Sequence, residues 1–216
     1  PRGGHGLIKY VSDHAKMPVI AHFLGLCHMY IDESADLDMA VNLVVNAKTQ
    51  RTGVCNAIET LLVNKNILKD FAPNLVVALQ EKQTELRVDT EFANSVDAKL
   101  IEATDKDWDT EYLDNILSIK TVNNVHEAIE HIAQYGSHHT ESIISTNDEN
   151  IEKFMQNVDA SCVVVNASTR FNDGGQLGLG AELGISTTKI HAYGPMGAEQ
   201  MTTARYVVIG NGQVRE

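Results

Sequence analysis

Cys55 is the residue whose surroundings best suit nucleophilic chemistry. It ends a polar loop, 48–55 (KTQRTGVC), that follows a predicted helix and precedes an apolar run typical of a buried strand. Polar, glycine-containing loops carry function more often than core positions do. Lys48 and Arg51 lie nearby in sequence, and positive charge favours the thiolate, the reactive form of cysteine. We therefore predict a reactive Cys55, with a buried, inert thiol as the alternative.

A second candidate is the long loop 166–180 (NASTRFNDGGQLGLG), which follows the apolar run 162–165 (CVVV). That run predicts a central parallel strand, and open α/β sheets bind ligands beyond the carboxyl ends of their strands. Four side chains of the loop could together hold a carboxylate or a phosphate, with the arginine binding in bidentate geometry: Asn166, Ser168, Thr169 and Arg170. The glycines do not follow the order of a dinucleotide-binding fingerprint. The alternative is an ordinary surface turn.

The nine histidines and the two other cysteines show no such pattern. Cys27 and Cys162 fall inside apolar, strand-like runs, where we expect core thiols. No Cys or His residues have the spacing of a zinc site, so the sequence predicts no metal. A distant histidine could pair with Cys55, but nothing in the sequence selects one.

Helical and strand-like patterns alternate along most of the chain, which predicts an α/β domain with a mainly parallel sheet flanked by helices. Helices are expected at 7–15, 36–45, 68–79, 125–135 and 147–158. Strands are expected at 27–31, 60–63, 116–122, 142–145, 162–165 and 202–209. The strand at 27–31 alternates apolar and polar residues, as a half-buried strand does.

Composition limits the classes of function. The chain has 216 residues, of which 43% are hydrophobic, enough for one large domain. Its 17 basic and 29 acidic residues give a net charge of −12, so we expect no nucleic-acid partner. No apolar run approaches the roughly 18 residues of a membrane span. Three widely spaced cysteines do not form a disulfide framework and fit a reducing, cytoplasmic setting.

Several segments resemble the gamma-glutamyl phosphate reductase (glutamate-5-semialdehyde dehydrogenase) family of the aldehyde dehydrogenase superfamily. They are 1–4 (PRGG), 45–51 (VNAKTQR), 55–63 (CNAIETLLV), 165–171 (VNASTRF), 178–182 (GLGAE) and 191–195 (HAYGP). The resemblance is specific because these motifs keep the family's order and spacing from the first residue to the last. It implies an aldehyde dehydrogenase-like catalytic domain. The implied reaction is NADPH-dependent conversion of L-glutamyl 5-phosphate to L-glutamate 5-semialdehyde and phosphate in proline biosynthesis.

The resemblance also implies a role for each candidate residue. Cys55 would attack the acyl carbon, expel phosphate and form a thioester. Its backbone N–H, with an asparagine from outside this chain, would hold the oxyanion. The loop 166–170 would bind an anionic end of the substrate, either the phosphate or the α-carboxylate, mainly through Arg170. Glu111 would bond the nicotinamide ribose of NADPH.

The family's organisation implies three segments. Residues 1–24 would be a remnant of the NADPH-binding Rossmann domain, ending in a helix and a strand, and 25–197 the catalytic domain. Residues 198–216 would be a C-terminal strand that mediates assembly of a homo-oligomer. The chain opens on Pro1 without a methionine, so we expect it to be processed or cut from a longer protein, with most of the NADPH site lying before Pro1.

The sequence departs from the family's pattern at two places. The segment 20–28 (IAHFLGLCH) is poorer in glycine than its family counterpart, and lacks the Glu or Thr that often stands there. Tyr193 stands where the family typically has arginine. Two alternatives remain: another acyl-phosphate or acyl-thioester reductase of the superfamily, or a folded fragment without catalytic activity.

Overall fold

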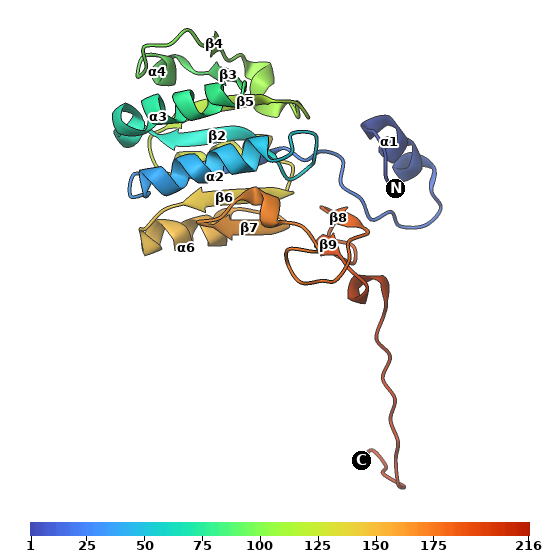
Figure 1. The fold of residues 1–216 in the computed structure, drawn as a ribbon. Coiled ribbons are helices and arrows are strands. Elements are labelled where there is room, and N and C mark those ends of the chain that lie inside the picture. Colours follow the sequence, from blue (N-terminus) through green and yellow to red (C-terminus); the bar gives the residue numbers. More distant parts are fainter.

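The computed structural model describes all 216 residues and has a seven-stranded sheet at its centre (Figure 1). The strands are β1 (Cys27–Ile31), β2 (Ile58–Asn64), β3 (Glu85–Val88), β4 (Ile101–Glu102), β5 (Ile116–Val122), β6 (Thr140–Ile144) and β7 (Cys162–Val165). Their order is β4-β3-β5-β2-β1-β6-β7, and every neighbouring pair is parallel. The predicted α/β domain with a parallel sheet is confirmed.

Helices cover both faces of the sheet. They are α2 (Leu37–Thr49), α3 (Leu68–Glu81), α4 (Thr90–Ala93), α5 (Val125–Tyr135) and α6 (Asp148–Asn157). Met29 and Leu61 pack in the core beneath α2 and α3, while Tyr30 and Leu62 pack in the core beneath α5 and α6. This division follows from the alternation of side chains along a strand. None of the helices is both long and apolar enough to span a bilayer.

Two strands lie differently from the prediction. β1 is buried along its whole length rather than half-buried, because β2 and β6 flank it and helices cover both of its faces. Its polar residue His28 is accommodated by a bond of 2.9 Å between its Nδ1 and the buried carboxylate of Glu141. β7 is an edge strand rather than a central one. Its sequence is apolar although it lies at the edge, because Val163 and Val165 pack on the α5–α6 core.

The N-terminal segment lies outside the sheet. Helix α1 (His5–His14) is followed by an extended stretch to residue 26 that forms no strand, so the strand expected near residue 24 is absent. The segment runs beside a small antiparallel pair, β8 (Gly184–Ser186) and β9 (Gly194–Met196). The Thr187 N–H donates to the Ala21 carbonyl at 3.1 Å, and Arg2 donates to the Leu183 carbonyl at 3.2 Å.

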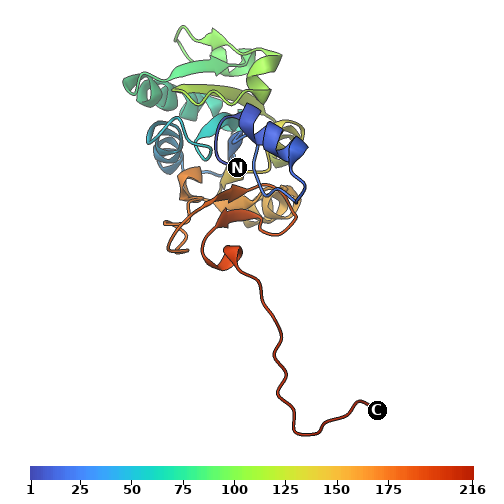
Figure 2. The same ribbon diagram turned by 90° about the vertical axis from the view of Figure 1, so that its right-hand side faces the viewer.

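The C-terminal segment extends away from the domain, as the red end of the ribbon shows in Figures 1 and 2. Residues 202–216 are exposed and form no strand, so the strand expected at 202–209 does not form within this chain. Tyr206 and Ile209 are 101% and 93% exposed. The segment has the apolar content of a strand but no neighbour to pair with.

Candidate active site

Cys55 lies at the amino-terminal edge of the sheet, on the loop that enters β2. The arrow of β2 points away from α1 in Figure 1, and Figure 2 looks onto this edge with α1, β8 and β9 in front of it. Gly25 precedes β1, Glu111 precedes β5 and His139 precedes β6. The sequence predicted a ligand site beyond the carboxyl ends of the strands. The site residues gather instead at the opposite edge, where the strands begin.

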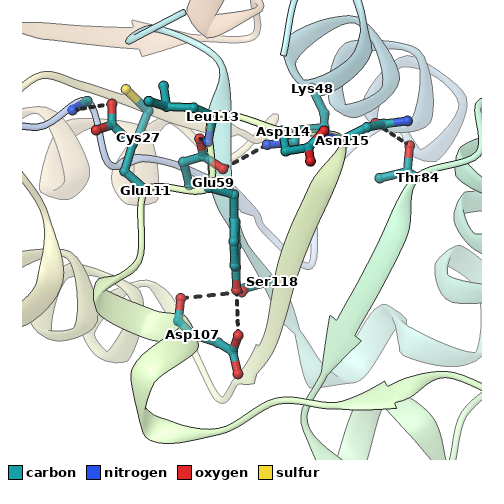
Figure 3. Close-up of polar contacts among 12 residues, drawn as sticks. Cys27, Lys48, Glu59, Thr84, Asp107, Glu111, Leu113, Asp114, Asn115 and Ser118 are labelled. Atoms are coloured by element: carbon teal, nitrogen blue, oxygen red, sulfur yellow. Dashed lines mark hydrogen bonds and ion pairs between the residues drawn. The ribbon is translucent and has the colours of Figure 1, made fainter. Parts of the chain in front are cut away.

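Neighbouring loops hold the backbone around Cys55. The Gly25 N–H donates to Glu111 Oε1 at 2.8 Å (Figure 3). The Cys27 thiol donates to the Cys55 carbonyl oxygen at 3.1 Å. Cys27 is fully buried, as expected, whereas the thiol-bearing residue Cys55 is half-buried. Cys55 is thus a partly exposed cysteine on a loop, and this position agrees with the prediction.

The electrostatics of Cys55 differ from the prediction. Burial raises the pKa of its thiol to about 11, and the carboxylates of Glu182 and Glu111 add to the rise. The expected support from Lys48 is wrong, because its ammonium is fully buried and bonds Glu59 at 2.7 Å. The cysteine is consequently a protonated thiol at neutral pH.

The Lys48–Glu59 pair fixes the loop that carries Glu111. Glu59 Oε1 accepts a hydrogen bond from the Leu113 N–H at 3.2 Å (Figure 3). Burial raises the pKa of Glu59 to about 7 and lowers that of Lys48. The pair therefore joins α2, β2 and the segment before β5 in one buried polar contact.

The predicted substrate loop runs back across the sheet. Asn166 lies at the carboxyl end of β6, where its side chain accepts from the Ser145 N–H and donates to the Ser145 carbonyl, both at 2.9 Å. Asn172 lies at the amino end of β6 and donates to Thr140 Oγ1 at 2.7 Å. Five residues of strand, roughly 16 Å, separate these two anchors. The loop thus reaches Cys55 while leaving Asn166 at the far edge.

The other three predicted residues follow on this loop, and two of them contact Asn56, the neighbour of Cys55. Ser168 and Thr169 are buried, Ser168 capping a short turn and Thr169 donating to the Asn56 carbonyl at 2.7 Å. Arg170 is half-exposed and donates to the side chains of Asn56 and Gln50. A depression of about 230 Å³ lies here, lined by Asn46, Gln50, Arg170, Phe171, Asp173 and Gln176. Arg170 is the cation that this depression offers to an anion.

Two histidines that the sequence did not select lie beside Cys55. The donor atoms of His22, Cys55 and His139 are all within 4.8 Å of one another. No spacing rule could identify this cluster, because its members come from loops before three different strands.

The fold is that of an aldehyde dehydrogenase-like α/β domain. An acetylating aldehyde dehydrogenase from Geobacillus thermoglucosidasius superposes on 99% of this chain and 56% of its own, with a TM-score of 0.73 at 22% identity. The gamma-glutamyl phosphate reductase of Thermotoga maritima matches much more closely, with a TM-score of 0.96 and 51% identity over 100% of this chain and 52% of its own.

Curated relatives give the same particular name. Gamma-glutamyl phosphate reductases of Clostridium botulinum and Geobacter metallireducens are 54% and 51% identical over 100% of this chain, which covers 52% and 51% of their lengths. The chain thus spans about half the length of the curated relatives it matches. No family model matches it. The resemblance to gamma-glutamyl phosphate reductase is confirmed over the whole chain.

Proposed function

We propose that this chain is the catalytic part of an NADPH-dependent reductase that converts L-glutamyl 5-phosphate to L-glutamate 5-semialdehyde and phosphate in proline biosynthesis. The match to proteins of that name over the chain's full length, at 51–54% identity, carries the proposal. Because the chain covers about half of those relatives, we assign the activity to a longer protein that contains it.

Cys55 is the nucleophile in this proposal. Its thiol loses a proton to solvent, the sulfur attacks the acyl carbon, and the carbon–oxygen bond to phosphate breaks with both electrons leaving on phosphate. The resulting thioester is the species to be reduced, and NADPH would supply the hydride. Cleavage of the carbon–sulfur bond then releases the aldehyde and restores the sulfur. Phosphate is a good leaving group, so no carboxylate base is needed to activate water.

Arg170 anchors an anionic end of the substrate. Its guanidinium is half-exposed beside a depression, and its charge opposes the rise in the pKa of Cys55. A local cation also offsets the repulsion that a chain of net charge −12 presents to a phosphorylated, carboxylated ligand. Asn166, Ser168 and Thr169 support the loop through the bonds described above and position Arg170.

Glu111 is the residue of this chain that fits NADPH. One carboxylate oxygen holds the Gly25 N–H, and the other can accept a hydrogen bond from a ribose hydroxyl. The remaining contacts of the cofactor would come from the part of the relatives that this chain does not cover. Residues 1–24 would join that cofactor domain, and 25–197 would form the catalytic domain.

We also propose a homo-oligomer, and the exposed tail supports it. Residues 198–216 would place their apolar stretch against a second copy, since an extended, unpaired apolar segment invites strand pairing. We place the protein in the cytoplasm, because its three cysteines are free thiols.

The test is turnover by the full-length protein with L-glutamyl 5-phosphate and NADPH. We expect Cys55→Ser to abolish NADPH oxidation, while the matched variant Cys162→Ser retains it. Equal turnover by Cys55→Ser and the unmodified protein would refute the nucleophile. Preference for an acyl-coenzyme A thioester over the acyl phosphate would favour another reductase of the superfamily.

A further inference from the structure

We propose that His22, Cys55 and His139 form a binding site for a thiophilic divalent cation of the Zn²⁺ class. Their three donor atoms lie within 4.8 Å of one another. A tetrahedral zinc ion with bonds of about 2.3 Å to sulfur and about 2.0–2.1 Å to nitrogen separates its ligand atoms by roughly 3.3–3.6 Å. Side-chain rotations that move the donor atoms by about an ångström would therefore bring all three onto one ion. A fourth coordination position would stay open.

One ring nitrogen of His139 has no hydrogen-bond partner. The residue is fully buried, and its Nδ1 lies 2.7 Å from Thr140 Oγ1, whereas its Nε2 is buried without any hydrogen bond. A buried polar atom left unsatisfied costs about 1–3 kcal/mol.

His22 is oriented in the manner of a metal-binding histidine. Its Nδ1 lies 2.9 Å from the carbonyl oxygen of Ile185. A carbonyl only accepts, so Nδ1 carries the proton and Nε2 keeps its lone pair. A hydrogen bond from the non-ligating nitrogen to a backbone carbonyl is the usual support of a metal-bound imidazole. The His22 and His139 rings meet edge to face with their centroids 5.3 Å apart.

A simple cysteine–histidine pair does not account for this cluster. Removal of the Cys55 proton needs one imidazole, whereas two lie beside this thiol. Two imidazoles and a thiol are instead three ligands for a borderline-soft cation. Coordination breaks the sulfur–hydrogen bond, releases the proton to solvent and forms a sulfur–metal bond, with no change of oxidation state.

Binding at this site would silence the nucleophile, and this consequence rests on the proposed reductase function. A sulfur bonded to the cation cannot attack an acyl carbon, so the cation would act as a reversible inhibitor. The binding claim itself needs no substrate and can be tested separately.

The experiment uses the purified protein, stripped with a chelator and titrated with Cd²⁺ or Zn²⁺. We expect one equivalent of cation, release of about one proton, and a sulfur-to-cadmium charge-transfer band in the ultraviolet. Cys55→Ser should remove the band, and His22→Gln should weaken Zn²⁺ binding at least tenfold. Cys162→Ser and the exposed-site variant His5→Gln are the matched controls.

Two results would overturn the site: an undiminished band in Cys55→Ser, or unchanged Zn²⁺ affinity in His22→Gln whose circular dichroism is native. Zn²⁺ inhibition of turnover, reversed by chelator, would support its consequence. If the protein turns over substrate but binds no cation, the metal site is refuted and the reductase proposal stands. If it binds the cation but does not turn over substrate, the metal site stands and the reductase proposal is refuted.

Discussion

The backbone of Gly25 lies directly against that of Cys55. A Cβ added at Gly25 would stand 2.2 Å from the Cys55 carbonyl oxygen and 2.5 Å from its Cα. Real Cβ atoms do not approach backbone so closely, so the entry to β1 and the loop of the thiol can pack together only if position 25 is glycine.

Gly25→Ala should displace the Cys55 loop. We expect the free energy of unfolding to fall by about 1–3 kcal/mol, the usual cost of inserting a methyl group into a packed site. Denaturant titration measures this loss, and turnover of the full-length protein should fall with it. Gly6→Ala is the control, because nothing lies within 4 Å of a Cβ there. Equal stability of the two variants would contradict the contact.

Alkylation of Cys55 should depend steeply on pH. With a thiol pKa of about 11, the reactive thiolate fraction grows about tenfold for each pH unit between 7 and 10. Iodoacetamide labelling followed by mass spectrometry should show this rise at Cys55, with slower labelling at the fully buried Cys27. A rate that levels off below pH 9 would show that the thiol is more acidic than its surroundings indicate.

Removal of one nearby negative charge should make Cys55 more acidic. Glu182 and Glu111 both raise its pKa, and glutamine can still accept the backbone hydrogen bond that each carboxylate now holds. We expect Glu182→Gln and Glu111→Gln to speed alkylation at pH 8 by a few-fold. Glu91→Gln, at an exposed position, should leave the rate unchanged. Identical rates in all three variants would exclude a carboxylate effect.

Arg170→Ala should weaken use of L-glutamyl 5-phosphate by the full-length protein. We expect kcat/KM to fall by a factor that corresponds to about 2–4 kcal/mol of lost transition-state stabilisation. This is the scale of a lost charge-assisted bidentate contact. Arg170→Lys keeps the positive charge but loses the bidentate geometry. Its kcat/KM should lie between those of Arg170→Ala and the unmodified protein. Lys69→Ala on the exposed side of α3 is the control. Unchanged kcat/KM in Arg170→Ala would remove the residue from the binding site.

The 216-residue chain by itself should bind NADPH weakly. Glu111 offers one charged hydrogen bond, worth about 1.5–3 kcal/mol, whereas micromolar affinity needs about 8 kcal/mol. Calorimetry should therefore detect no micromolar binding. A measured micromolar dissociation constant would mean that the cofactor contacts lie within these residues after all.

Local signals explain why much of the fold could be predicted. The strand at 116–122 agrees with the prediction to the residue, because its β-branched residues favour a strand whatever its neighbours are. Asp36 and Asn147 cap the helices predicted to begin at these two residues, and a cap bonds backbone only two or three residues away. The loop position of Cys55 followed from the same kind of local pattern.

The features that could not be predicted depend on partners distant in sequence. The apolar valines of β7 indicated a central strand, but strand order is decided by the whole sheet. Lys48 is near Cys55 in sequence, but in the fold its ammonium forms an ion pair with Glu59. His139 is brought to Cys55 by the adjacency of loops that no spacing rule joins.

The loop 166–172 is bonded to both ends of β6, so the loop and the strand should unfold locally as one unit. Its anchors, Asn166 on Ser145 and Asn172 on Thr140, cannot both be released without exposing the ends of β6. Amide hydrogens along β6 and along residues 166–172 should then exchange with solvent in a single correlated opening. An anion held by Arg170 would slow deuterium uptake at Ser145, at the other end of the strand, although it touches nothing there.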